Sequence, residues 1–149
     1  MKKTAIYPGT FDPITNGHID LVKRGLRIFD KVIIAITTAQ KKQPLFSTEE
    51  RIKLIKKSFK GLKNVSVDSF DGLLVEYVKS KNGIAVIRGL RAVSDFEYEL
   101  QIALMNRRLA VGIETVFMMP SEEYSFLTST IVKEVASFEG SVKGLVPEA

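Results

Sequence analysis

The sequence predicts an α/β protein with a single Rossmann-like open sheet of five parallel strands and helices on both faces. Two observations lead to this prediction. Short β-prone apolar segments alternate with longer segments in which apolar residues recur at helical spacing, a pattern typical of a parallel sheet joined by right-handed crossovers. The loops rich in Gly, Thr, Ser and basic residues follow strands, so we expect them along the one sheet edge where ligands bind in this fold class.

The composition fits one domain, predicted over residues 1–149. Hydrophobic residues make up 45% of the chain and charged residues 26%, which is ordinary for globular proteins. No segment approaches the ~20 apolar residues of a membrane span, and the first predicted strand begins too early to leave room for a signal peptide. With no cysteine and one histidine, the sequence argues against disulfides and a zinc site, and we expect a cytoplasmic protein.

The first predicted unit is a strand over residues 4–7, a turn-rich loop, and a helix that ends near Asp30. Its apolar stripe comprises Ile19, Val22, Leu26 and Phe29. Between strand and helix lie two Pro, two Gly, two Thr, one Asn and the only His of the chain. Because a helix N-terminus carries unpaired N–H groups and partial positive charge, this loop is a candidate anion site.

Four residues of this loop are candidates for the anion site. Gly9 and Gly17 lack a Cβ, which would let a polyanion approach the backbone. Asn16 is the predicted N-cap, which puts His18 in the first helical turn near the same anion. Asn-Gly before a helix is also ordinary turn chemistry, and a lone His is more often structural. The position of His18 in the loop, and not on the apolar stripe, favours a functional role.

Four further strands are predicted, over residues 32–36, 65–70, 84–87 and 115–119. The first of these is apolar on both faces, as expected of a central parallel strand. A polar loop with Lys42 follows it, and Arg88-Gly89-Leu90-Arg91 follows the strand over 84–87.

Four further helices are predicted between and after these strands. A capping box of Ser47 and Glu50 opens the first, which Gly61 closes. A second stops around Asn82-Gly83, a third runs from about Asp95 to Ala110, and the last covers Thr130 to Phe138. The expected apolar faces of the first three comprise Ile52, Ile55 and Phe59; Leu73, Leu74, Tyr77 and Val78; and Phe96, Leu100, Ala103 and Leu104.

The chain is basic, with a net charge of +5 and a pI of about 9.4. The basic residues fall in small groups and do not form a long stripe interleaved with aromatic residues. Lys42, Arg88 and Arg91 lie just after strands, where ligands collect. A phosphate-rich small molecule therefore explains them better than a nucleic-acid duplex.

Two segments suggest a nucleotide site, although both the dinucleotide fingerprint and the Walker A pattern are missing. The first ends in Thr15-Asn16-Gly17-His18, and the second spans residues 125–134. Hydroxyl residues at a helix start can bond phosphate oxygens alongside backbone N–H groups. The segment contains three hydroxyl residues, Thr128, Ser129 and Thr130. A phosphate-binding role and an ordinary N-cap role explain them equally well.

These two segments resemble the nucleotidyltransferase superfamily marked by a His-x-Gly-His motif and a Ser/Thr-rich second motif. Within it, the chain is similar to the bacterial phosphopantetheine adenylyltransferase family over nearly its whole length. The similar segments are Tyr7–Pro13 with Gly17-His18, Ile87–Arg91 and Asp95–Glu99. Leu127-Thr128-Ser129-Thr130 departs from the common Ile-Ser-Ser-Ser but keeps the hydroxyl groups.

The resemblance implies transfer of AMP from MgATP to 4′-phosphopantetheine, giving dephospho-CoA and pyrophosphate. By this analogy, His18 and Thr10 hold the transition state, and Lys42 and Arg91 grip the phosphates. A phosphate nucleophile is already largely dianionic at neutral pH, so the attack is direct and in line, without a general base.

The resemblance also implies the substrate-binding residues. Those expected to bind 4′-phosphopantetheine are Thr10, Lys42, Leu73, Leu74 and Arg88. Those expected to bind ATP are Thr10, Phe11, His18, Gly89, Leu90, Arg91, Glu99, Tyr124, Ser125, Phe126, Leu127, Thr128, Ser129 and Thr130. Without the analogy, Lys42 is an ordinary solvated lysine and Glu99 an exposed glutamate in the middle of a helix.

Mg²⁺ is the expected cofactor, bound mainly through ATP phosphates, because the motif loops lack a carboxylate cluster. Asp12 is the one nearby acid, and its neighbours Phe11 and Pro13 are compatible with a purely structural role. The family analogy adds a homohexamer and regulation by CoA. No nucleic-acid or membrane partner is expected.

Two other functions fit the sequence. One is a sibling transferase with a different acceptor, such as a pyridine mononucleotide or an alcohol phosphate. The other is a non-catalytic module that binds nucleotide without turnover, or RNA with an affinity that falls steeply with salt. The position of Arg88 and Arg91 at one strand end argues against this second class.

Overall fold

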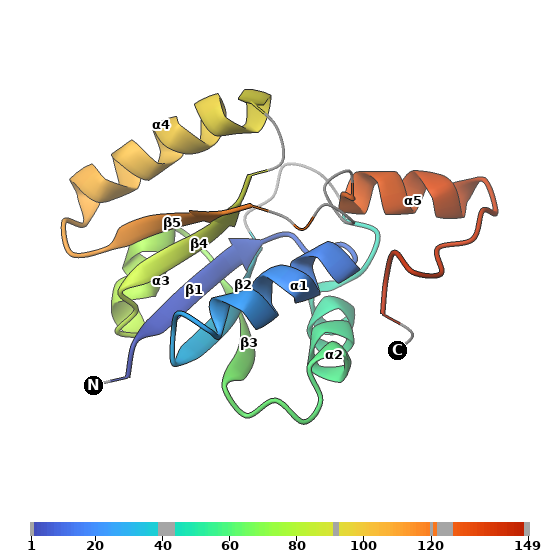
Figure 1. Cartoon of the computed structure of the whole chain (residues 1–149), viewed down its shortest axis with the longest axis horizontal. Coiled ribbons are helices and arrows are strands. Elements are labelled where there is room, and N and C mark those ends of the chain that lie inside the picture. The colour runs from blue at the N-terminus through green and yellow to red at the C-terminus, as the bar shows by residue number, and fades with distance from the viewer. Residues whose placement is uncertain (1, 39–43, 91–92, 120, 122–126, 148–149) are drawn as a thin grey trace.

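Strands and helices alternate along the whole chain, as the sequence predicts. The structure is a computed structural model that describes residues 2–38, 44–90, 93–119, 121 and 127–147 (Figure 1). Its strands are β1 (Thr4–Gly9), β2 (Lys31–Thr37), β3 (Val65–Phe70), β4 (Ala85–Gly89) and β5 (Glu114–Met118). Its helices are α1 (Asn16–Gly25), α2 (Thr48–Ser58), α3 (Leu74–Ser80), α4 (Val93–Leu109) and α5 (Ser129–Ser137).

The sheet has five parallel strands in the order β3-β2-β1-β4-β5, which confirms the predicted fold class. The first strand pairs with β2 on one side and with β4 on the other. Successive connections therefore run in opposite directions from β1, and the switch point lies between the carboxyl ends of β1 and β4. In open α/β sheets this is where ligands bind.

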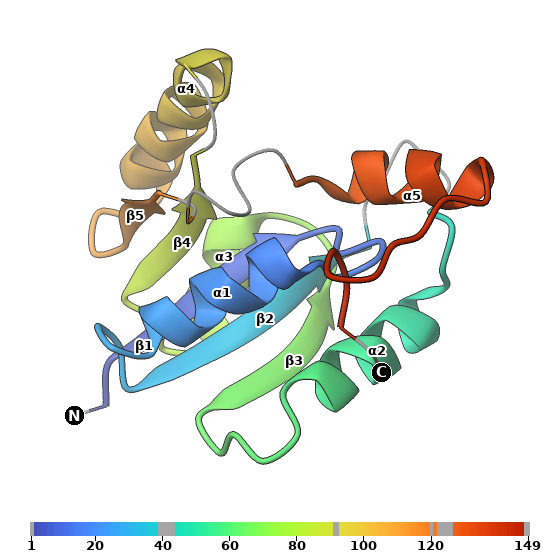
Figure 2. The same cartoon turned by 45° about the vertical axis from the view of Figure 1, so that its right-hand side comes forward.

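Helices cover both faces of the sheet. On one face, α1 and α2 pack on alternate strand residues that include Ala5, Ile34 and Ile87. On the other face, α3 packs on Ile6, Ile33 and their neighbours. Figure 2 shows α1 in front of the sheet and α3 behind it. The inner strand β2 is buried from Val32 to Ile36, as expected for a strand that is apolar on both faces.

The boundaries of β1 and α1 differ from the sequence prediction by two residues or more. The first strand continues to Gly9, because Pro8 and Gly9 lie in register with Ala35 and Ile36 of β2. The first helix ends at Gly25 and not near Asp30. Phe29 is nevertheless buried, so the predicted apolar stripe packs on the sheet beyond the end of the helix.

The longest described helix, α4, lies at the edge of the sheet against β5 and α3 (Figure 1). The side of it that carries Phe96, Leu100 and Leu104 is exposed in the single chain. Among the described residues, no helix combines the length and apolar character needed to cross a membrane.

Candidate active site

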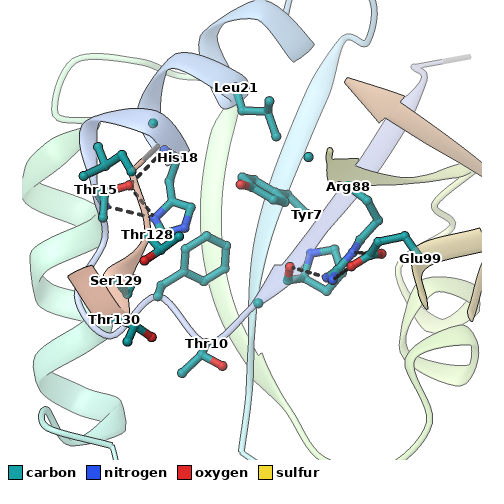
Figure 3. A pocket seen from close by; sticks show the side chains of 16 residues that line it. Tyr7, Thr10, Thr15, His18, Leu21, Arg88, Glu99, Thr128, Ser129 and Thr130 are labelled. Atoms are coloured by element: carbon teal, nitrogen blue, oxygen red, sulfur yellow. Dashed lines mark hydrogen bonds and ion pairs between the residues drawn. The ribbon is translucent and has the colours of Figure 1, made fainter. Parts of the chain in front are cut away.

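A cavity of about 280 Å³ opens at the switch point of the sheet, between the carboxyl ends of β1 and β4. Its walls come from the end of β1, the β1–α1 loop, the first two turns of α1, the end of β4, one residue of α4 and the start of α5. Figure 3 shows His18 and the hydroxyl residues of α5 on one side of the cavity and Arg88 with Glu99 on the other. The cavity therefore brings the two candidate sequence segments together.

The first turn of α1 holds His18 through a capping box with Thr15. The Thr15 hydroxyl accepts the His18 N–H at 3.3 Å, and the Thr15 N–H donates to His18 Nδ1 at 2.9 Å. The prediction that Asn16 is the N-cap is therefore wrong. Asn16 instead donates its backbone N–H and its side-chain amide to the carbonyls of Leu145 and Gly144.

This capping box fixes the chemistry that the imidazole offers. Because Nδ1 accepts the Thr15 N–H, a neutral imidazole carries its proton on Nε2. The ring also packs edge-on against Phe11, with 4.8 Å between ring centroids, and Phe11 packs edge-on against Tyr7 at 5.2 Å. His18 is thus a hydrogen-bond donor whose ring is held both by the Thr15 N–H and by the Phe11 ring.

The Phe11 ring packs closely over Gly9. A Cβ at Gly9 would lie 3.0 Å from this ring, tighter than most contacts, so a larger residue there would require the ring to shift. The space that the sequence assigned to a polyanion at Gly9 is thus occupied by Phe11. Phe11 itself has a φ of 50°, in the left-handed region that side chains other than Gly, Asn and Asp rarely adopt.

The Asp12 side chain, which belongs to this loop, is buried. Its carboxylate accepts the backbone N–H groups of Leu45 and Phe46 and forms an ion pair with Lys133 of α5. Burial acts to raise the pKa of Asp12, but the two amide groups and the Lys133 ammonium outweigh it and lower the pKa below its usual value. Asp12 is therefore an ionised structural group at neutral pH.

The start of α5 uses two of its three hydroxyl groups within the protein. The Thr128 side chain is the N-cap and accepts the Ile131 N–H at 3.0 Å. The Ser129 hydroxyl donates to the Pro13 carbonyl at 2.7 Å. Thr130 is exposed and lines the cavity, as do Thr10 and the buried Leu127. The N-cap interpretation of this segment is therefore confirmed for Thr128, while Thr130 lies where a ligand would reach it.

Arg88 and Glu99 form an ion pair across the opposite wall. Arg88 Nε donates to Glu99 Oε2 at 2.8 Å, Nη2 donates to Oε1, and Nη1 donates to the Pro8 carbonyl at 3.3 Å. Burial acts to lower the pKa of Arg88, but the paired Glu99 carboxylate outweighs burial and raises the pKa above its usual value. Glu99 is buried, so the interpretation of it as an exposed helical residue is wrong.

A second cavity, of about 210 Å³, lies on the far side of this ion pair. Arg88 and Glu99 line both cavities. The second is otherwise mostly apolar, with Leu74 from α3, Val86 from β4 and Ile102 from α4 in its wall. Leu73 is 59% exposed and lies in the wall of neither described cavity.

Comparison with known proteins matches residues 6–135 to the cytidylyltransferase-like family model. A phosphopantetheine adenylyltransferase from Thermodesulfovibrio yellowstonii is 61% identical over 99% of this chain and 92% of its own length. Another from Alkaliphilus oremlandii is 57% identical over 97% of this chain and 92% of its length. The chain belongs to the phosphopantetheine adenylyltransferase family. This confirms the family resemblance inferred from the sequence.

Solved structures with low sequence identity share the fold. A bifunctional NMN adenylyltransferase/ADP ribose pyrophosphatase from Francisella tularensis superposes with a TM-score of 0.75 at 14% identity, over 98% of this chain and 45% of that one. A putative nicotinate-nucleotide adenylyltransferase from Vibrio parahaemolyticus gives 0.70 at 18% identity, over 98% and 87% of the two chains. These likenesses support the Rossmann-like architecture alone.

Most of the predicted site residues converge on the two cavities. Thr10, Phe11, His18, Arg88, Gly89, Glu99 and Leu127–Thr130 line the first cavity, and Leu74 lines the second. Leu90 lies beside them and donates its N–H to the Met118 carbonyl. Lys42, Arg91, Tyr124, Ser125 and Phe126 lie outside the described residues. Within the part of the chain that is described, no three His, Cys, Asp or Glu side chains converge as metal ligands would.

Two residues that shape the site escaped the sequence analysis. Thr15 is the capping-box partner of His18. It could have been predicted from its hydroxyl group and its place three positions before the histidine, which is the spacing of a capping box. Arg51 is buried and donates from Nη1 to the Thr10 carbonyl at 2.8 Å. Arg51 could have been predicted from its helical spacing with Ile55 and Phe59, because this spacing puts the arginine on the buried face of α2.

Proposed function

We propose that the protein transfers the adenylyl group of ATP to 4′-phosphopantetheine, giving dephospho-CoA and pyrophosphate in coenzyme A biosynthesis. The observation that carries the proposal is the cavity at the switch point, where the His18 wall faces Arg88 across a space open to ligands. Membership of the phosphopantetheine adenylyltransferase family supports this choice of substrates.

In this reaction an oxygen of the acceptor phosphate attacks the α-phosphorus of ATP. The bond from that phosphorus to the bridging oxygen breaks, and pyrophosphate leaves with the electron pair. The nucleophile has a second pKa of about 6 and needs no general base at neutral pH. The protein therefore has to align the two phosphates and stabilise charge on the α-phosphoryl oxygens.

His18 is the proposed donor to a non-bridging α-phosphoryl oxygen. The Thr15 N–H directs the imidazole proton to Nε2, and the Phe11 ring holds the plane of the imidazole. Thr10 lines the same cavity with an exposed hydroxyl group. Lys42 and Arg91 are proposed to neutralise the remaining phosphate charge, Lys42 also contacting the acceptor, by analogy with the family.

Arg88 is the proposed ligand of the acceptor phosphate. It lines both cavities, so a phosphate bound to it would lie beside ATP in the larger cavity while the pantetheine arm occupies the smaller one, against Leu74. Leu73 is proposed to cover the outer part of that arm. The apolar wall of the smaller cavity supports an acceptor with an extended, weakly polar tail.

The larger cavity is the proposed ATP site. The residues proposed to hold ATP are Thr10, Phe11, His18, Gly89, Leu90, Arg91, Glu99 and Tyr124–Thr130. The N-terminus of α5, with Thr130 exposed at its first turn, offers phosphate-binding groups. Mg²⁺ is proposed to arrive with ATP and to be held mainly by its phosphates. The Asp12 carboxylate is already bound by Lys133 and two amide groups. It is therefore a poor Mg²⁺ ligand, which supports the phosphates as the main ligands.

We further propose that the protein is a cytoplasmic homohexamer that responds to CoA, as the family analogy implies. The exposed apolar side of α4 supports an oligomer. Leu104, Met105 and Val111 are each more than half exposed there, beside Arg107 and Arg108. Burial of this side between subunits would remove that apolar surface from water.

A coupled pyrophosphate assay tests the proposed reaction. The expected result is pyrophosphate release that requires ATP, Mg²⁺ and 4′-phosphopantetheine together. Nicotinamide mononucleotide and glycerol phosphate serve as control acceptors. Release that is equally fast with a control acceptor would identify a sibling transferase, and binding of ATP without release would identify a non-catalytic module.

A further inference from the structure

We infer that Asp12 is a positioning residue of this site, which holds the Thr10–Pro13 backbone in the conformation that orients His18. The inference rests on the proposed function for its kinetic readout. Asp12 is not among the residues that line the cavity. Its effect would be transmitted through Phe11, its neighbour in the chain, whose ring packs against the imidazole at 4.8 Å between centroids.

Both carboxylate oxygens of Asp12 are used by groups from other segments. Oδ1 accepts the Phe46 N–H at 2.8 Å, and Oδ2 accepts the Leu45 N–H at 2.7 Å and the Lys133 ammonium at 3.1 Å. The side chain is 1% exposed. One carboxylate therefore joins the β1–α1 loop to the segment that precedes α2 and to α5, and water does not compete for it.

Thr10 and Pro13, the residues at the two ends of this segment, are tied to α2 and α5. The Thr10 carbonyl accepts from Arg51 of α2 at 2.8 Å, and the Pro13 carbonyl accepts from Ser129 of α5 at 2.7 Å. Phe11 lies between these two fixed points with a φ of 50°. A large side chain keeps such a conformation only where its surroundings hold it there, and such sites cluster where function needs a fixed geometry.

An ionised carboxylate is required for this arrangement. Two amide N–H groups and an ammonium all need acceptors, and only a carboxylate supplies acceptors on both oxygens. In Asp12→Asn, one oxygen becomes an NH₂ group that would face an N–H or the ammonium. The side chain keeps its size, but one backbone hydrogen bond and the ion pair are lost. The loop is then free to relax, and Phe11 would no longer fix the His18 ring.

The kinetic test compares Asp12→Asn with Asp68→Asn at a temperature where both variants are folded. Asp68 is a matched control, because it also accepts a backbone N–H, pairs with a lysine (Lys81) and has a lowered pKa, but lies outside both cavities. For Asp12→Asn we expect kcat to fall about 10- to 100-fold, as small misplacements of reacting groups cause. KM for each substrate should stay within about threefold, and Asp68→Asn should keep wild-type kcat.

A second readout does not depend on activity. His18 is the only histidine of the chain, so its ring nitrogens give an unambiguous NMR signal in untagged protein. Wild-type protein and Asp68→Asn should show one tautomer with the proton on Nε2, whereas Asp12→Asn should show shifted, averaged ring signals. Lys133→Arg should keep the wild-type signals and most of kcat, and Lys133→Met should resemble Asp12→Asn.

Unchanged kcat and unchanged ring signals in folded Asp12→Asn would overturn the inference. So would an equal loss of kcat in Asp68→Asn, which would mark a general effect of stability, or a tenfold rise in the Mg²⁺ requirement, which would make Asp12 a metal ligand. If the wild-type protein lacks the proposed activity while the His18 signals respond to Asp12→Asn, the proposed function fails and the positioning role stands.

Discussion

Two ion pairs, Asp12–Lys133 and Arg88–Glu99, flank the active site, and their surroundings differ. In the first, Asp12 is held by two backbone amides as well as by Lys133, and the carboxylate is almost completely buried. In the second, Arg88 and Glu99 bind mainly one another, and both line open cavities. The first pair cannot change partners without moving the backbone, whereas the proposed acceptor phosphate would replace Glu99 as the partner of Arg88.

The difference shows how the same chemistry serves two purposes. Burial opposes the charged form of both Asp12 and Arg88, and in each case the partners restore it. Where backbone groups supply part of the compensation, the charge fixes geometry. Where one side chain, Glu99, supplies most of it, a ligand anion can take over that part of the compensation. Variants on the first side should therefore change kcat, and variants on the second side should change KM.

The largest effect is expected for His18→Ala, on the fixed side of the cavity. Loss of a donor to the transition state typically lowers kcat by about 10²–10³, or roughly 2.7–4 kcal/mol. The ATP dissociation constant should change little, because this interaction strengthens only as charge develops. Steady-state kinetics and calorimetry give the two values.

Glu50→Ala is the matched control for this variant. Glu50 completes a capping box with Ser47 at the start of α2, as His18 does with Thr15 at the start of α1. Both substitutions remove a side-chain acceptor of an N-cap N–H, so the two should lower Tm to a similar extent. A kcat for His18→Ala within a fewfold of wild type would remove His18 from the catalytic centre.

The second effect is expected for Arg88→Ala, on the exchangeable side. A charge-assisted hydrogen bond contributes ~1.5–3 kcal/mol, so KM for 4′-phosphopantetheine should rise roughly tenfold or more while KM for ATP changes far less. Lys81→Ala, which removes a cation paired with Asp68 away from both cavities, should leave both KM values unchanged. Equal increases for the two substrates would mean that Arg88 does not discriminate between them.

A smaller effect of opposite sign is expected for Glu99→Gln. The neutral amide competes less strongly than a carboxylate for the Arg88 guanidinium, so the acceptor phosphate should bind about threefold more tightly. Tm should fall, because the ligand-free protein then contains a partly buried arginine without a full counter-charge. Calorimetric titration with 4′-phosphopantetheine measures the change, and weaker acceptor binding would show that Glu99 helps to hold the acceptor.

The sequence predicts the elements of this fold well, because periodicity reports burial directly. The strand over residues 65–70 and the capping box at Ser47 and Glu50 are confirmed residue for residue. The N-cap of α1 was predicted one residue late, since Thr15 and Asn16 are both good caps. Their competition is decided by the C-terminal segment, whose carbonyls accept hydrogen bonds from Asn16.

The polar interior was beyond prediction because its partners lie far apart in the chain. Asp12 meets Lys133 across 121 positions, and Arg51 meets Thr10 across 41. Glu99 is buried where Arg88 of β4 binds it, and α4 has apolar residues on more than one side, which hides its inner face. Spacing along the chain indicates which residues share a face, but it does not reveal which buried charges meet.

The smallest effect concerns the pH dependence of stability and separates Asp12 from Asp68. The usual pKa of an unfolded aspartate is about 3.9, and the folded protein lowers the pKa of Asp12 below its usual value. Below about pH 4 the unfolded chain therefore binds more protons than the folded one. The stability that Asp12 contributes is present above this pH and is lost as the pH falls through the folded pKa.

Urea unfolding of wild type and Asp12→Asn between pH 7 and pH 3 measures this contribution. The difference in unfolding free energy should be constant above about pH 5 and should shrink as the pH falls below about 4, because only the wild type has a carboxylate to protonate. Asp68→Asn should show the same direction with a smaller amplitude, since Asp68 is 41% exposed and solvent screens its ion pair. A difference that widens toward acid pH would mean that burial dominates and raises the pKa of Asp12. The carboxylate would then be a poor candidate for the fixed charge on which the geometry of His18 depends.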